Sequence, residues 1–216
     1  MNKIAKTIIS IVLLVAVIFL AYKLYEEIMT PIRFEKAYNV RSEVVKEKMM
    51  KIRDAEVAFM SKYNHYTADF DSLINFIKKD SLEVIKSEGV VPDSIYLNAK
   101  NPKEAELTAI KLGIIKRDTI RISVKDSLFA KYNVDTLAFI PYNESKEKFQ
   151  LNAGTIKTLS KTIRPVFELK VHNNSFTQGL DRQLVINLND KARDNDKFPG
   201  YIVGSMEEVS TSGNWD

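Results

Sequence analysis

The feature that most constrains this chain of 216 residues is an uncharged apolar run close to its N-terminus. Residues 7–22 contain no charged side chain, and 14 of them are apolar. As a helix, this run would rise about 24 Å, less than the roughly 30 Å hydrocarbon core of a bilayer. Residues 4–25 would rise about 33 Å, which is enough to cross it. The run therefore predicts a transmembrane helix over residues 4–25, in contact with the lipid bilayer.

The flanks of the run suit the two membrane surfaces. Lys3, Lys6 and Lys23 can extend their charged ends towards water, and Tyr22 and Tyr25 suit the headgroup region. The side chains that we expect inside the bilayer are Ile8, Ile11, Leu14, Val15, Ile18 and Phe19.

Two other interpretations of the run stay open, a cleaved signal peptide and a buried core helix. In a signal peptide, residues 1–6 would be the charged region and residues 7–20 the apolar region. Bulky Phe19 then stands where a small residue should precede the cleavage site. The chain has no cysteine, which excludes a lipoprotein anchor, disulfides and thiol catalysis. We favour an uncleaved anchor.

The orientation of the anchor does not follow from charge alone, because basic residues lie on both sides of the run. They are Lys3 and Lys6 before it, and Lys23, Arg33, Lys36 and Arg41 after it. The short N-terminus favours a signal-anchor with the C-terminal part translocated. We expect residues 1–30 to form the anchor and its junction, and residues 31–216 to form an extracytoplasmic domain.

Beyond the anchor the chain is polar and of mixed charge. It carries 32 basic and 28 acidic side chains, for a formal net charge of +4. This balance is typical of a solvated surface rather than of a basic stripe, so we expect no nucleic-acid partner.

A long helix is predicted over residues 31–63. Thr30 fits an N-cap and Pro31 the first helical position, and residues 32–63 contain neither Gly nor Pro. Arg41 interrupts an apolar stripe with a period near 3.6. The stripe consists of Phe34, Tyr38, Val45, Met49, Ile52, Ala55 and Phe59. We expect this stripe to pack against the protein's own domain rather than to form a long coiled coil.

Shorter elements follow. A helix beginning near Phe70 has Asp69 or Thr67 as its cap, and a helix over residues 102–112 lies between Asn101 and Gly113. Alternating patterns predict strands at residues 119–124, 136–142, 148–156, 165–172 and 201–203, and a four-residue leucine period predicts a helix over 180–192. The fold class is therefore α+β. It combines an N-terminal transmembrane helix that continues into a long amphipathic helix, two or three short helices, and a four-to-five-stranded antiparallel sheet.

Residues 52–73 resemble the end of the long helix and the following turn in type IV pilins and type II secretion pseudopilins. The matching positions are Ile52, Ala55, Phe59, Tyr63, Tyr66, Thr67, Asp69 and Leu73. The wider layout is also similar: an apolar N-terminal helix, its amphipathic continuation, and a small antiparallel sheet. The chain departs from the family at two positions. Pilin precursors have a glycine just before the apolar helix, where they are cut, and a glutamate near the start of the helix, which is used in assembly. Here the first glycine is Gly89, and no acidic residue precedes Glu26.

The resemblance implies a permanently anchored, pilin-like protein of the bacterial inner (cytoplasmic) membrane, with a periplasmic C-terminal domain. Its function would be that of a non-enzymatic accessory or structural subunit of a secretion or surface-assembly complex, and other envelope proteins are the expected partners. The alternatives are a periplasmic binding module or scaffold that positions another membrane complex, and an anchored hydrolase. A small-molecule ligand stays open.

No catalytic or cofactor motif is present, so we predict neither catalytic residues nor a cofactor. His65 and His172 are expected as turn or surface residues. Asp190, Asp194 and Asp196 are weak candidates for calcium ligands, because their spacing is not that of an EF-hand. Four aromatic residues are candidates either for partner binding or for packing within the domain. They are Tyr63, Tyr66, Phe70 and Trp215.

Overall fold

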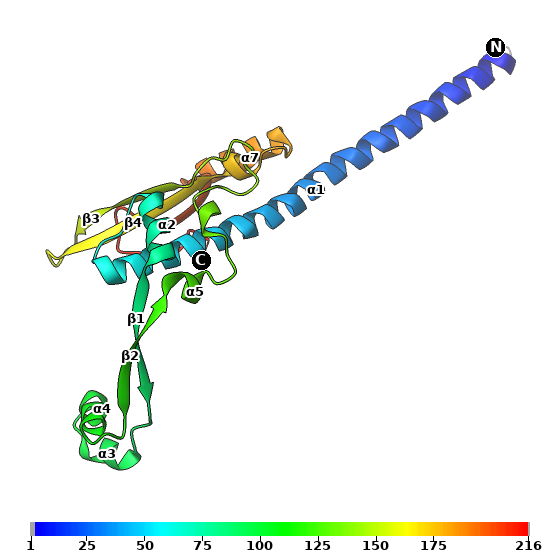
Figure 1. Cartoon of the computed structure of the whole chain (residues 1–216). Helices are drawn as coiled ribbons and strands as arrows, with labels where there is room; N and C mark the ends of the chain where they lie inside the picture. Colours follow the sequence, from blue (N-terminus) through cyan, green and yellow to red (C-terminus); the bar gives the residue numbers. More distant parts are fainter. Residues whose placement is uncertain (1–2, 216) are drawn as a thin grey trace. The chain divides into compact units, whose positions relative to one another are not determined.

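The computed structural model describes the backbone of residues 3–215, and the side chains of residues 8–83, 89–116 and 119–215. It confirms the α+β class (Figure 1). In chain order the elements are α1 (Lys3–Tyr63), α2 (Phe70–Lys79), β1 (Ser81–Glu88), α3 (Asp93–Asn98), α4 (Pro102–Lys111), β2 (Lys116–Ser123), α5 (Val124–Leu128), the 3-10 helix η1 (Val134–Thr136), β3 (Gln150–Lys157), β4 (Ile163–His172), α6 (Asn173–Phe176), α7 (Arg182–Arg193) and β5 (Gly200–Gly204).

The chain forms two compact units, and α1 contributes to both. One unit comprises residues 1–50 and 138–216, and the other comprises residues 51–137. Each unit has its own antiparallel sheet, so the single four-to-five-stranded sheet that we predicted is wrong in this respect. The strands divide into a three-stranded sheet in the order β3-β4-β5 and a two-stranded sheet of β1 and β2.

Helix α1 is continuous, and the predicted helix start at Thr30-Pro31 is wrong. Pro31 lies inside the helix, where it has no N–H to donate to the preceding turn. The Thr30 hydroxyl donates to the Glu26 carbonyl (2.7 Å), so Thr30 does not cap a helix. The helix ends at Tyr63 because Asn64 adopts the left-handed conformation (φ 60°).

The apolar stripe predicted along α1 is confirmed from Val45 to Phe59, whereas Phe34 and Tyr38 are half-buried. Val45, Met49, Ile52, Ala55 and Phe59 are all buried. Arg41, which interrupts the stripe, is also bonded within the fold. Its guanidinium donates to the carbonyls of Phe176 (3.1 Å) and Gln178 (2.7 Å), and it lies over the Tyr142 ring.

In the unit of residues 1–50 and 138–216, the core lies between α1 and the three-stranded sheet. Strand β4 is central, and its buried side chains Val166, Phe167, Leu169 and Val171 supply much of this core. The register pairs Leu151 of β3 with Leu169 and Val203 of β5 with the same residue. This register agrees with the strands predicted at 148–156, 165–172 and 201–203.

The strand predicted over residues 136–142 is absent from this described region. Only Phe139 forms an isolated bridge, to Lys148, and Pro141 lacks the N–H that a longer ladder would need. At the start of the segment, the Asn133 side chain accepts from Asp135 N and begins η1.

In the unit of residues 51–137, α2 packs on the end of α1 through buried Leu73, Phe76 and Ile77. Asp69, rather than Thr67, caps α2 by accepting from the backbone N–H groups of Asp71 and Ser72. The predicted start of α4 is confirmed, because Asn101 accepts from Glu104 N.

Strands β1 and β2 form a ribbon that ends in helices α3 and α4 (Figure 1). Strand β1 and helix α3 were not predicted. A small core holds α3 and α4 together, with Val91, Ala105, Ala109 and Ile115 buried and Ile95, Ala99 and Ile110 packed against them.

Candidate membrane anchor and interaction sites

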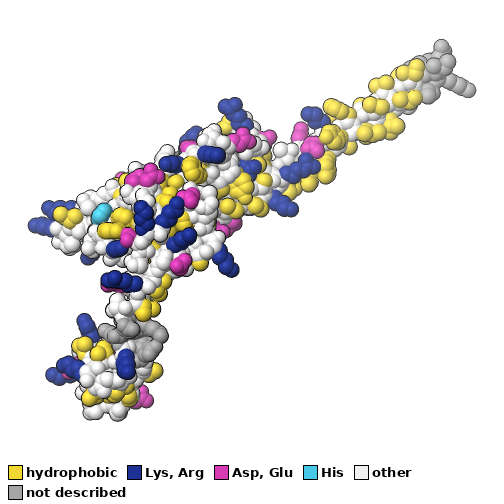
Figure 2. Space-filling model, in the orientation of Figure 1, with side chains coloured by type: hydrophobic (Ala, Val, Ile, Leu, Met, Phe, Trp, Pro, Cys, Tyr) yellow, Lys and Arg dark blue, Asp and Glu magenta, His cyan; other side chains and the backbone are white. Residues whose placement is uncertain are grey.

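The N-terminal part of α1 is apolar and exposed. From Ile8 onward the described helix is long and apolar enough to cross a membrane, and its most apolar stretch is not buried in the protein. Leu14, Val15 and Ile18 are each about three-fifths exposed, at 62%, 61% and 61%. Figure 2 shows hydrophobic side chains covering this part of the helix. Such a surface needs an apolar environment outside the chain.

All six predicted membrane-spanning residues lie on this exposed helix; they are Ile8, Ile11, Leu14, Val15, Ile18 and Phe19. Tyr22 and Tyr25 are also exposed, where a headgroup region would begin. Lys3 and Lys6 lie outside the residues whose side chains are described.

The turn after α1 is stabilised by aromatic packing in the unit of residues 51–137. The Phe59 ring contacts the rings of Tyr63 (4.7 Å between centroids), Phe76 (5.2 Å) and His65 (5.5 Å). Phe70 is buried, whereas Tyr63 is 42% exposed and its hydroxyl donates to Asp80 Oδ2 (2.7 Å). Phe70 therefore belongs to the core, whereas Tyr63 is only partly covered.

The same turn covers a buried carboxyl group that was not among the predicted sites. Glu56 is fully buried, and its Oε2 accepts from Thr67 N (3.0 Å). Its Oε1 has no hydrogen-bond partner among the described residues. Burial raises the pKa of Glu56 to about 8, and the Thr67 N–H opposes this shift only in part. The carboxyl group is therefore protonated at neutral pH.

The end of the β1–β2 ribbon exposes large apolar side chains. Leu97 is 86% exposed, Val90 83% and Leu112 64%. Because soluble surfaces seldom concentrate such side chains on so small a body, this ribbon tip is a candidate interaction surface. A hollow of about 340 Å³ lies between α3 and α4 and includes Ile95 and Leu112.

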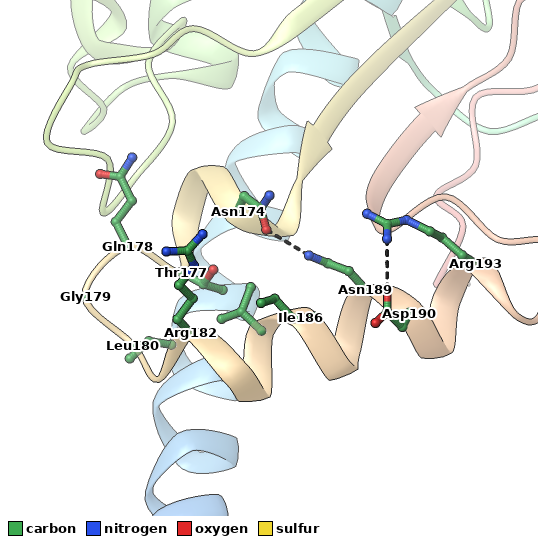
Figure 3. A pocket seen from close by; sticks show the side chains of 11 residues that line it. Asn174, Thr177, Gln178, Gly179, Leu180, Arg182, Ile186, Asn189, Asp190 and Arg193 are labelled. Atoms are coloured by element: carbon green, nitrogen blue, oxygen red, sulfur yellow. Dashed lines mark hydrogen bonds and ion pairs between the residues drawn. The ribbon is translucent and has the colours of Figure 1, made fainter.

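A recess in the unit of residues 1–50 and 138–216 lies between α7 and the α6–α7 loop (Figure 3). Its volume is about 400 Å³. The polar lining residues include Asn174, Gln178, Arg182, Asp190 and Arg193, and the apolar ones are Leu180, Val185 and Ile186. We call this recess the α7 groove.

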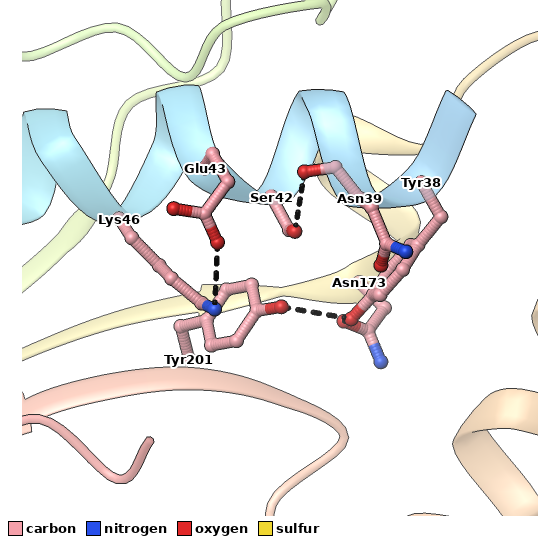
Figure 4. Close-up of polar contacts among 7 residues, drawn as sticks. All are labelled: Tyr38, Asn39, Ser42, Glu43, Lys46, Asn173 and Tyr201. Atoms are coloured by element: carbon pink, nitrogen blue, oxygen red, sulfur yellow. Dashed lines mark hydrogen bonds and ion pairs between the residues drawn. The ribbon is translucent and has the colours of Figure 1, made fainter. Parts of the chain in front are cut away.

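A chain of polar side chains connects α1 to the α7 groove. The Tyr38 hydroxyl lies 3.0 Å from the Tyr201 hydroxyl and donates to Asn173 Oδ1 (3.4 Å; Figure 4). Asn173 Nδ2 then donates to Asn189 Oδ1 (2.9 Å), and Asn189 Nδ2 donates to Asn174 Oδ1 (2.8 Å). Burial and the contact with Tyr201 raise the pKa of Tyr38, so this chain of hydrogen bonds stays neutral.

The C-terminal tail lies along the edge of β5. Asn214 exchanges hydrogen bonds with Ile202, and Trp215 lies edge-on against Tyr201 at 5.3 Å between ring centroids. Lys46 of α1 lies over both rings. Figure 4 shows its ion pair with Glu43. Trp215 thus packs within its own unit. That it also binds a partner stays a prediction, as it does for Tyr63 and Tyr66.

The histidines and the acidic cluster have structural contacts. His65 is exposed, and His172 caps α6 by accepting from Asn174 N (3.1 Å). Burial, followed by the charge of Arg193, lowers the pKa of His172. Among the described residues, no three His, Asp or Glu side chains are placed to hold a metal ion. Of the predicted calcium ligands, Asp190 pairs with Arg193 (2.8 Å), Asp194 ends α7, and Asp196 lies in the following turn.

Comparison with known proteins adds no relative: no protein-family model, curated protein or solved structure matches the chain.

Proposed function

We propose that the chain is a single-pass, non-enzymatic protein of the bacterial inner membrane. Its two folded units lie in the periplasm, where it serves as an accessory or structural subunit of a secretion or surface-assembly complex. The observation that carries the proposal is α1, whose first part is apolar and exposed while its second part is built into both units. A helix of this kind fixes folded units at a membrane surface.

Three further features support an interaction role over a catalytic one. The segment of residues 52–73 resembles pilins and pseudopilins, and the structure places its Tyr63 at the surface. The ribbon tip exposes large apolar side chains. In the series of hydrogen bonds from Tyr38 to Asn174, the buried amides of Asn173 and Asn189 both donate to and accept from other members of the series. Such mutual satisfaction is typical of a rigid scaffold.

The membrane orientation is tested with C-terminal reporters in a bacterial host. We expect a fusion to alkaline phosphatase to be active, because this enzyme matures only outside the cytoplasm. We expect a fusion to green fluorescent protein to be dark, and alkaline carbonate to leave both fusions in the membrane pellet. A fluorescent, phosphatase-negative pair would place the units in the cytoplasm and overturn the proposal.

The ribbon tip favours a second candidate function, that of a scaffold which positions another membrane complex. In cells, a photo-crosslinking amino acid at Leu97 should then give a discrete adduct, because this side chain is 86% exposed at the tip. The matched control is Leu159, which is fully exposed in the turn between β3 and β4. The same adduct from both positions would reveal non-specific capture, and no adduct from Leu97 would refute the scaffold function.

A further inference from the structure

The α7 groove has a polar group at each end and an apolar centre. Arg182, Ile186 and Asp190 follow one another at four-residue intervals, so they lie along one face of α7 (Figure 3). Eight helical residues separate the two charged positions by about 12 Å. Ile186, 40% exposed, lies between them.

The Arg182 end presents unused hydrogen-bond donors. The side chain of Arg182 forms no ion pair or hydrogen bond with any described residue, although it lines the groove. Asn174, which also lines the groove, uses its Oδ1 to accept from Asn189, which leaves its Nδ2 hydrogens available. Because the hydrogen bonds run from Asn173 through Asn189 to Asn174, the buried chain ends in a donor at the groove.

The wall of the groove is held in place before any ligand arrives. Arg41 donates to the carbonyls of Phe176 and Gln178, and Gln178 Oε1 accepts from Glu144 N (3.0 Å). Thr177 donates to the Asn173 carbonyl (2.8 Å). A pre-organised wall reduces the entropy lost on binding.

The Asp190 end carries a carboxylate together with the guanidinium of Arg193, which also lines the groove. One carboxylate oxygen of Asp190 accepts from Arg193, at 2.8 Å, and the pair is exposed. A carboxylate can accept about four hydrogen bonds, so Asp190 retains capacity for a second donor. Along α7 the groove therefore offers hydrogen-bond donors at Arg182, an apolar surface at Ile186 and a hydrogen-bond acceptor at Asp190.

We propose that the α7 groove binds a short extended peptide. Its carboxylate lies at Arg182 and Asn174, its aliphatic side chain lies on Ile186, and its ammonium group or amide hydrogens lie at Asp190. Three extended residues span about 10 Å, which matches the separation of the two ends. The carboxylate is that of a free C-terminus or of an acidic side chain, since both present the same two oxygens. This inference does not depend on the membrane topology proposed above.

The test uses the full chain in detergent micelles and the peptide Ala-Leu-Ala, followed by saturation-transfer NMR. We expect saturable binding with a dissociation constant on the order of 0.1–1 mM. Amidation of the C-terminus should weaken binding at least tenfold, and acetylation of the N-terminus should weaken it less. Ala-Leu-Glu amide distinguishes the two sources of the carboxylate, because it binds only if an acidic side chain suffices.

Variants locate the site. Arg182→Gln should weaken the binding of Ala-Leu-Ala at least tenfold, and Arg182→Lys should restore part of it. Arg182 is exposed and Asp181 caps α7, so the fold should survive, which an unchanged thermal unfolding curve verifies. The charge-matched control Arg164→Gln, at an exposed position near the start of β4, should bind as the wild type does. Absence of saturable binding, undiminished binding of the amide, or equal losses in Arg182→Gln and Arg164→Gln would each overturn the proposal.

Discussion

Replacing Glu56 by Gln should make the unit of residues 51–137 more stable at pH 9, by several kcal/mol, and should remove a pH dependence that the wild type shows. The carboxyl group is fully buried, one of its oxygens has no partner among the described residues, and burial raises its pKa from 4.5 to about 8. Gln keeps the shape of the side chain and can still accept from Thr67 N. It carries no charge that would have to form inside the protein.

The sign follows from proton binding. Between pH 4.5 and 8 the folded state keeps a proton on Glu56 that the unfolded state has released, so the free energy of unfolding falls as pH rises. The limiting slope is about 1.4 kcal/mol per pH unit. At pH 5 the wild type and Glu56→Gln should differ by only about 1 kcal/mol, because both side chains are neutral.

Other buried groups limit the pH window in which Glu56 can be isolated. His172, whose pKa is lowered, increases the stability of its own unit with rising pH, and that change is complete above the ordinary value of 6.5. Lys48, buried and bonded to the Phe139 carbonyl, has a pKa lowered to about 8, so its contribution rises above that pH. Tyr66, which lies near Glu56, has a raised pKa and titrates only in more alkaline solution. Between pH 6.5 and 8, the change in the free energy of unfolding with pH therefore comes chiefly from Glu56.

Hydrogen exchange measured by mass spectrometry on peptides covering residues 52–79 provides the readout, because the only tryptophan, Trp215, lies in the other unit. Glu83→Gln is the matched control, since Glu83 is exposed and pairs with Arg121 at the surface. It should leave the slope of the wild type intact. A wild-type exchange free energy that stays flat from pH 6.5 to 8 would contradict a buried neutral Glu56.

The second large effect concerns the membrane. The double variant Val15→Arg/Ile18→Arg should leave the membrane fraction, because each arginine at the centre of a spanning helix costs roughly 2.5–3.5 kcal/mol. The readout is the distribution of the full chain between pellet and supernatant after alkaline carbonate extraction.

The control for this variant lies on the same helix. Val40 is 58% exposed, much like Val15 at 61%, but it lies well beyond the predicted span. Val40→Arg/Val44→Arg should therefore stay in the pellet. If the arginines at positions 15 and 18 also leave the protein in the pellet, the apolar part of α1 is not its anchor.

Local signals in the sequence predicted much of the fold. The stripe from Val45 to Phe59 is buried, and Asp69 and Asn101 cap the helices that they were expected to cap. These features depend on spacing within one element and on hydrogen bonds that close within a few residues. Strand β1 was missed because its partner, β2, begins only at Lys116 and the pairing surrounds an insertion.

The candidate sites were harder to predict. Asn173 and Asn189 are buried polar residues whose partners come from different elements, so no local pattern reveals them. The burial of Glu56 was predictable from its spacing, since it lies four residues after Ile52 and three before Phe59 on the same face of α1. The exposure of Leu97 depends on how α3 packs, and the sequence alone does not determine this packing.

The insertion between β1 and β2 has a consequence for how this chain could be dissected and how it could have grown. Glu88 and Lys116 face each other in the ladder, and a Cβ added to Gly89 would lie 2.4 Å from the Ile114 carbonyl oxygen. The two ends of segment 89–115 therefore meet, and the segment has its own small core. It is a cassette. A two-residue Asn-Gly turn could replace it and close the hairpin, and a foreign module with adjacent termini could be grafted in its place.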